Sequence, residues 1–183
     1  MVSAIAALTV ACTSSTQTPS ASTTSTPLSN TPDTGPTVVT PLIASAVAAP
    51  IPVPATDGKV HLAYELQLTN VLDQEVTLTS VDVRAAHRTL LNLAGERLAY
   101  WTRVMGNPAS TTKLGPAQSA AVWLDVSLDP GGTVPAELVH AIGVSLAQPR
   151  PPLFPATMTE TVAPVTVQTR KPAVIAPPLV GSN

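Results

Sequence analysis

Three histidines, His61, His87 and His140, are the side chains of this chain best able to hold a metal ion or move a proton. None belongs to a His-x-His, His-Glu-x-x-His or Cys-x-x-Cys element. A catalytic zinc needs three converging protein ligands and an open position for water. His61 and Glu65 are four residues apart, but on a strand that spacing separates them by about two pleats. The sequence therefore predicts no metal site and no cofactor.

The remaining candidates for chemistry are few. No Gly-x-Ser-x-Gly element and no glycine-rich phosphate loop is present, and the single cysteine, Cys12, lies near the N-terminus. Tyr100, Trp101 and Trp123 can form an aromatic platform for a sugar. The chain has only two Trp, two Tyr and one Phe, so packing in the core or at a sheet edge is the favoured interpretation. We expect no catalytic residue and a chain that is not an enzyme.

Strands must position these side chains. Between residues 62 and 69 every second residue is apolar, which is typical of a half-buried strand. The same alternation recurs over 120–128 and 138–146. It places His61 on a solvent-facing strand position and His140 in an apolar, buried set, where we expect it to be hydrogen-bonded.

Other stretches depart from strict alternation. Over 76–83 the apolar phase slips by one residue, and a β-bulge near Thr79 and Ser80 would account for this. We expect His87, four residues after this stretch, to lie in a hairpin. A last strand is expected over 162–167, with Pro164 marking an edge or a bulge, while 90–101 fits a strand, a loop and a helical turn equally well. Several short strands with such turns predict an all-β, antiparallel sandwich of the immunoglobulin or fibronectin type over residues 37–170.

Composition also indicates what flanks the predicted sandwich. Residues 4–11 form a short apolar run that ends in small residues before Cys12, which is the outline of an export signal. Because the run ends at a cysteine, we expect residues 1–12 to be a lipoprotein signal and Cys12 to be the lipidation site. An ordinary cleaved signal or a disordered N-terminus is the alternative. Residues 13–36 are almost all Ser, Thr, Pro, Asn and Gln, a composition that predicts a disordered stalk. We expect residues 171–183 to be a Pro-rich linker toward a downstream domain that this sequence does not contain. The net charge of −2 and scattered basic residues exclude nucleic acid as a partner.

Several segments carry a family resemblance. They are Asp57 to Asn70, Ser80 to Val83, Arg88 to Leu91, Ala121 to Val126, Pro135 to His140 and Pro172 to Leu179. Together they resemble the accessory region that precedes the catalytic domain in secreted bacterial lysostaphin/LytM-type zinc metallopeptidases. That family cleaves peptides of the cell wall with zinc held by His-x-x-x-Asp and His-x-His elements. Neither element occurs here, so no catalytic residue is carried over.

Two functions follow from the sequence. In the first, the chain is an exported, envelope-anchored accessory module, held at the membrane by a lipid on Cys12, whose partner is a peptidase domain or peptidoglycan. In the second, it is a stand-alone ligand-binding or structural lipoprotein of the cell envelope. The sequence does not name the ligand.

Overall fold

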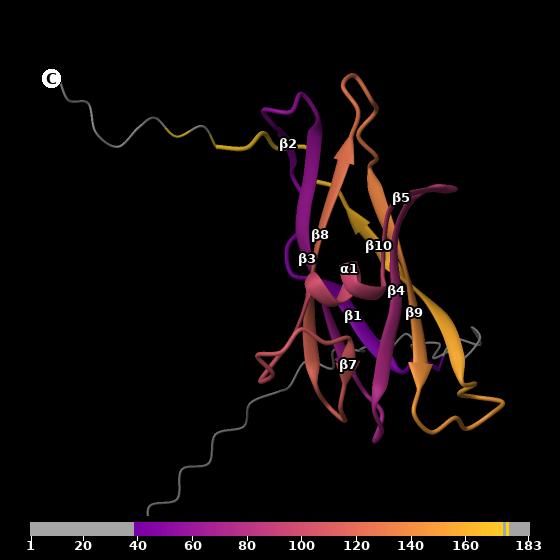
Figure 1. Cartoon of the computed structure of the whole chain (residues 1–183). Coiled ribbons are helices and arrows are strands. Elements are labelled where there is room, and N and C mark those ends of the chain that lie inside the picture. Colours follow the sequence, from indigo (N-terminus) through magenta and orange to yellow (C-terminus); the bar gives the residue numbers. More distant parts are fainter. Residues whose placement is uncertain (1–38, 174, 176–183) are drawn as a thin grey trace, which may run out of the picture. The chain divides into compact units, whose positions relative to one another are not determined.

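The computed structural model describes residues 39–173 and residue 175. The expected signal segment, lipidation site Cys12 and stalk, and most of the expected C-terminal linker, lie outside the described residues. Apart from one short helix, the regular secondary structure of the described part consists of strands, which form two packed antiparallel sheets (Figure 1). The predicted all-β sandwich is therefore confirmed.

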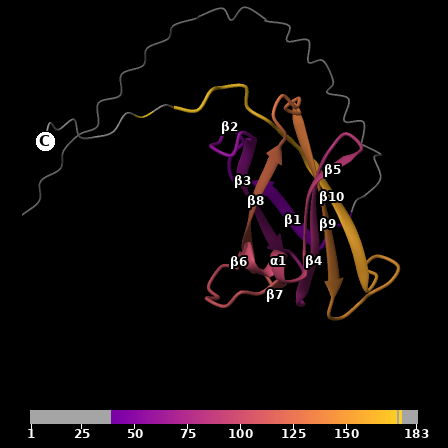
Figure 2. The same ribbon diagram turned by 45° about the horizontal axis from the view of Figure 1, so that its top comes forward.

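The first sheet has the order β1-β3-β8-β6, with β2 also paired to β3. Its strands are β1 (Leu42–Ala46), β2 (Pro52–Pro54), β3 (Val60–Asn70), β6 (Thr102–Val104) and β8 (Ser119–Leu128). The second sheet has the order β10-β9-β4-β5, with β7 also paired to β4. Its strands are β4 (Val76–Ala85), β5 (Arg88–Ala94), β7 (Lys113–Leu114), β9 (Glu137–Leu146) and β10 (Thr157–Thr166). These two orders correspond to the ABED and GFC sheets of an immunoglobulin-type sandwich, with β5 added at the edge of the second sheet (Figure 2).

The core lies between the sheets and is built from the predicted alternation. Along β3, Leu62, Tyr64, Leu66 and Leu68 all point inward and are buried. Strand β8 contributes an equivalent inward set of aliphatic side chains, and β9 contributes another in which His140 is the one polar member. Because the core contains many Leu and Val side chains and one Tyr, it depends on close aliphatic packing rather than on large rings.

Both predicted irregularities are present. The pairing of β4 with β9 shifts register between Leu78 and Ser80, which is the expected bulge. Gly143 lies opposite this bulge. A Cβ atom there would come within 2.5 Å of the Ser80 Oγ atom and 2.6 Å of the Thr79 Oγ1 atom. The pairing of β10 with β9 shifts between Val162 and Val165, on either side of Pro164.

Two expectations need correction or completion. The last strand begins at Thr157 rather than at Val162, because Thr157 to Thr161 pair with β9 although their sequence shows little apolar alternation. The ambiguous stretch 90–101 is divided between two elements. Its first part belongs to β5, and its second part is the helix α1 (Gly95–Tyr100), which buries Leu98.

Candidate functional site

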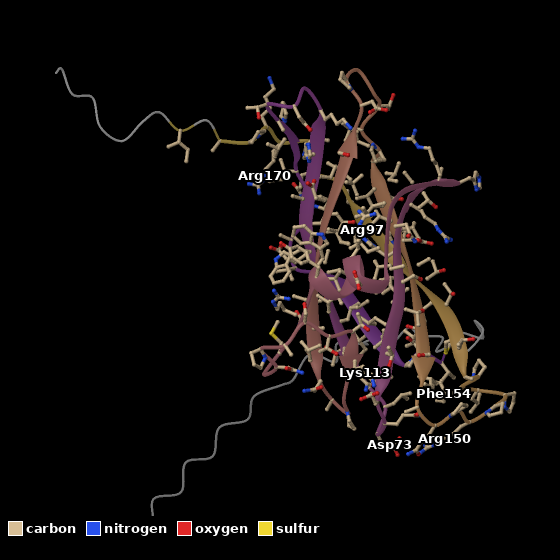
Figure 3. All side chains as sticks on the ribbon, viewed as in Figure 1. Asp73, Arg97, Lys113, Arg150, Phe154 and Arg170 are labelled. Atoms are coloured by element: carbon tan, nitrogen blue, oxygen red, sulfur yellow. The ribbon has the colours of Figure 1, made fainter. Side chains whose placement is uncertain are left out.

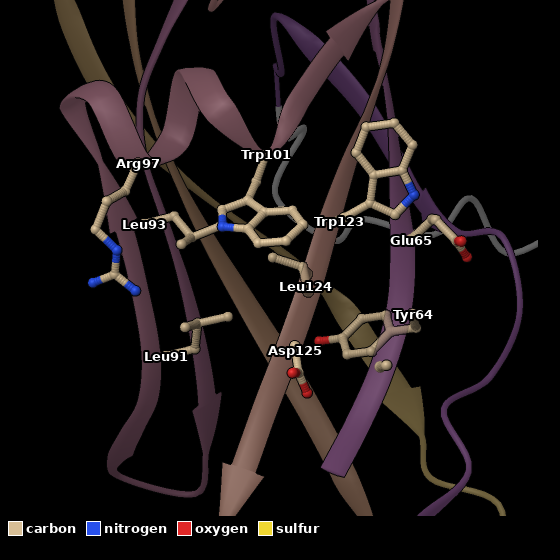
Figure 4. A pocket seen from close by; sticks show the side chains of 10 residues that line it. Tyr64, Glu65, Leu91, Leu93, Arg97, Trp101, Trp123, Leu124 and Asp125 are labelled. Carbon is tan, nitrogen blue, oxygen red and sulfur yellow. The ribbon is translucent and has the colours of Figure 1, made fainter.

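A groove opens between the edges of the two sheets, where β8 of one sheet faces β5 of the other and α1 closes one end (Figure 4). We call it the tryptophan groove. It has a volume of about 440 Å³, and its lining residues are Ala63, Tyr64, Glu65, Leu91, Leu93, Arg97, Trp101, Trp123, Leu124 and Asp125. Apolar walls with a few polar groups are characteristic of ligand sites.

Both tryptophans of the chain line this groove and both are exposed. Trp123 lies out of phase with the inward-facing residues Val122 and Leu124, so its indole stands on the outer side of β8 and is 39% exposed. Trp101 follows α1 and is 43% exposed. It meets Tyr100 edge to face, with ring centroids 5.0 Å apart. Of the two placements expected for these aromatics, the core or a sheet edge, the structure shows the second: they lie partly exposed beside the edge strand β6.

Charged groups lie on two walls of the groove. Glu65 and Asp125 come from the neighbouring strands β3 and β8, while Arg97 projects from α1 on the other side (Figure 4). Among residues 39–173 neither Glu65 nor Arg97 forms an ion pair. The groove therefore presents free charge of both signs beside two indoles.

Asp125 is held in place by His61. The His61 Nδ1 atom lies 2.8 and 3.0 Å from the two carboxylate oxygens of Asp125, and its Nε2 atom lies 3.1 Å from Asp57. The hydrogen bonds to Asp125 and Asp57 raise the pKa of His61. The backbone N–H of Lys59 and the ring of His61 lower the pKa of Asp57. His61 is thus on the outer face as predicted, and its partners there are Asp125 and Asp57.

His140 lies on the inward face of β9, and its side chain is buried as predicted. Its Nε2 atom and the Tyr64 hydroxyl oxygen are 2.7 Å apart, a hydrogen bond that links the two sheets beneath the groove. No partner of its Nδ1 atom is found among the described residues. Burial lowers the pKa of His140 to about 4 and raises that of Tyr64. This pair is structural, since it lies between the sheets.

The three histidines do not converge. His61 lies on β3, His87 in the turn between β4 and β5, and His140 on β9. Within the described residues, no three His, Cys, Asp or Glu side chains are grouped so that they could hold a metal ion. No helix of this part of the chain is both long and apolar enough to cross a membrane.

A second groove separates β1 from β10 and is bordered by Thr40, Met158 and Glu160. Burial raises the pKa of Glu160, and hydrogen bonds from the Thr40 side chain and the Leu42 backbone act in the opposite direction. Its Oε1 atom is buried and has no partner among the described residues. The lining of this second groove contains one ionisable residue and no aromatic side chain, so it offers fewer groups to a ligand than the tryptophan groove does.

The sequence singled out the two tryptophans of the groove but not its other lining residues. Trp123 was signalled by its place opposite the apolar phase of β8. Arg97 and Leu91 lie in the ambiguous stretch 90–101, and nothing local shows that this stretch faces β8. The bond between His61 and Asp125 joins residues on different strands and depends on the register of β3 with β8.

Comparisons with known proteins add little. No family model matches the chain, and no curated protein matches it. Among solved structures, the X-ray structure of the Northeast Structural Genomics Consortium target SoR45 is similar to it. The two are 12% identical, the match covers 77% of this chain and 93% of that chain, and the TM-score is 0.40. A TM-score of this size supports no conclusion about function.

Proposed function

We propose that this chain is a non-catalytic, envelope-anchored accessory module that binds cell-wall polymer through the tryptophan groove. The observation that carries the proposal is the exposure of both indoles, Trp101 and Trp123, in one groove that also contains Arg97, Glu65 and Asp125. Leaving two large aromatic side chains half-exposed forgoes burial that would stabilise the fold. Such exposure is characteristic of surfaces that bind a ligand.

The arrangement suits a peptidoglycan-like polymer, which contains sugar rings and short peptides. The flat indole faces can pack on either component, and the charged groups can hydrogen-bond hydroxyl, amine or carboxylate groups of the ligand. Export and anchoring are supported by the apolar run that ends at Cys12. The association with a cell-wall peptidase is supported by the resemblance described above.

The test is co-sedimentation of the purified chain with isolated peptidoglycan sacculi. Trp123→Ala and Trp101→Ala are each expected to weaken binding by about 30-fold or more, because buried aromatic anchors contribute about 2 kcal/mol or more to binding. Leu153→Ala is the matched control. Leu153 is also an exposed large apolar side chain, at 62%, but it adjoins Phe154, far from Arg97 in Figure 3.

The control variant is expected to bind as the parent chain does. Circular dichroism should be unchanged for all three variants, since the three side chains are exposed. Wild-type binding by both tryptophan variants would show that the groove is not the binding site. Absence of binding by the parent chain itself would reject peptidoglycan as the ligand.

A further inference from the structure

The tryptophan groove lies along a strand edge that is only half covered. Two short strands pair with the outer edge of β3, one after the other along its length. β1 lies opposite Leu66–Asn70 and β2 lies opposite Val60–Leu62. On the outer edge of β8 there is only β6, and its pairing ends at Val122. Within the described part of the chain, nothing pairs with the outer edge of β8 beyond Trp123.

The chain leaves this edge because it coils into α1. The last bond on this side runs from the Trp123 N–H to the Trp101 carbonyl, at 3.0 Å. Running backwards from Trp101, the chain does not continue beside β8 but forms the helix Gly95–Tyr100. A vacant strand position therefore begins where Trp101 ends, and α1 blocks one end of it.

The backbone groups that face this position follow from the ladder. In an antiparallel sheet, alternate residues direct their N–H and C=O groups to the same side. Because Trp123 donates outward to Trp101, the N–H and C=O groups of Asp125 and Ser127 also point outward. Unpaired strand edges of this kind are templates for an added strand.

We propose that the tryptophan groove receives the C-terminal end of an extended peptide, which adds to β8 as an antiparallel strand opposite Asp125 and Ser127. This inference rests on the proposed use of the groove as a binding site and names the part of the ligand that is recognised. An antiparallel peptide runs from Ser127 toward Trp123, so its C-terminus meets α1. There Arg97 is the cation that lines the groove, and it suits a free carboxylate.

The register also predicts the side chains of the peptide. Residues directly opposite one another on paired strands share a face. The peptide residue opposite Asp125 therefore lies beside Asp125 on the outer face, the face that also carries Glu65 of β3. The lining of the groove carries two carboxylates, Glu65 and Asp125, and one cation, Arg97. A basic residue is expected at this position.

The next peptide residue, opposite Leu124, faces inward. Leu124 is buried, and the groove beside it is walled by Leu91 and Leu93 of β5. An apolar side chain is expected here, and it is the last residue because Trp101 occupies the place opposite Trp123. The residue opposite Val126 is apolar for the same reason.

The test peptide is acetyl-Thr-Val-Lys-Val with a free C-terminal carboxylate, titrated into the purified full chain. The chain has two tryptophans, both in the groove, so intrinsic tryptophan fluorescence reports on this site alone. N-methylation of the lysine amide removes a bond to Asp125 and is expected to weaken binding about tenfold. N-methylation of the last valine amide, which faces away from β8, is the matched control and should have little effect.

Two further changes test the chemistry. Replacing the carboxylate by an amide, or the peptide's lysine by glutamate, should each weaken binding about tenfold. Arg97→Ala should remove the preference for the free carboxylate, while Arg150→Ala, an arginine far from the groove in Figure 3, should keep it. Equal effects of N-methylation at both positions would overturn strand addition.

The sacculus experiment separates this inference from the proposed function. One outcome is that the chain binds sacculi through Trp101 and Trp123 and also binds chitotetraose, yet does not bind the peptide. That result would mean that the groove recognises sugar and that the peptide inference is wrong. Loss of both sacculus and peptide binding would reject the function and the inference together. Peptide binding without sacculus binding would retain strand addition and reject only peptidoglycan as the ligand.

Discussion

The buried pair of His140 and Tyr64 makes stability depend on pH in a defined window. His140 is fully buried, and burial lowers its pKa in the folded chain to about 4, against an ordinary value of 6.5. Between these values the unfolded chain binds a proton at His140 that the folded chain does not. Stability from this group is therefore complete above pH 6.5 and is lost as the pH falls toward 4.

The magnitude follows from the width of the window. Each pH unit corresponds to about 1.4 kcal/mol, so the loss from His140 amounts to about 3 kcal/mol between pH 6.5 and 4. The contribution of Glu160 to stability has the opposite pH dependence. Because burial raises its pKa in the folded chain above the usual 4.5, this contribution decreases as the pH rises just above 4.5. His61, with its raised pKa, loses its contribution only as the pH rises above 6.5.

A double variant isolates the His140 contribution. Tyr64→Phe combined with His140→Leu removes both polar groups, so that no buried donor or acceptor is left without its partner. Urea unfolding at pH 7, 6, 5 and 4.5, followed by tryptophan fluorescence, gives the free energy of unfolding for each chain. Between pH 7 and 4.5 the parent should lose about 2 kcal/mol more than the double variant, at a slope of at most about 1.4 kcal/mol per pH unit. Parallel pH profiles for the two chains would refute the reasoning.

Two more outcomes are expected. Gly143→Ala should lower the free energy of unfolding by about 1–3 kcal/mol, because a Cβ atom would meet the Ser80 and Thr79 hydroxyls at 2.5 and 2.6 Å. Adding Ser80→Ala should recover part of this loss in the same denaturation experiment, and no recovery would count against the clash. Cys12→Ala should move the protein from the membrane fraction to the soluble fraction, since a lipid contributes about 0.8 kcal/mol per buried methylene; unchanged fractionation would mean that Cys12 is not the anchor.

The sequence by itself determined the principal strands of this protein. Alternation fixes which residues of β3, β8 and β9 face the core, because a strand has a period of two whatever its neighbours are. The slip in phase at Thr79 and Ser80 required a bulge, and the structure has one there. The inward phase of β9 likewise predicted that His140 is buried.

The sequence alone did not predict the short edge strands. β1, β2, β6 and β7 have two to five residues each, too few to show a period. They are strands only because they pair with β3, β8 and β4. The start of β10 at Thr157 has the same cause, since its pairing with β9 replaces the missing apolar signal.

The site was decided by tertiary structure. The outward phase of Trp123 can be read from β8, but the groove exists because two sheets bring β5 and α1 opposite that strand. The bond between His61 and Asp125 joins residues 64 positions apart and requires one particular register of β3 with β8. The half-covered edge of β8 depends on where β6 stops and α1 begins. Local patterns record which face of an element is apolar, whereas pairing between distant segments decides which side chains and backbone groups meet.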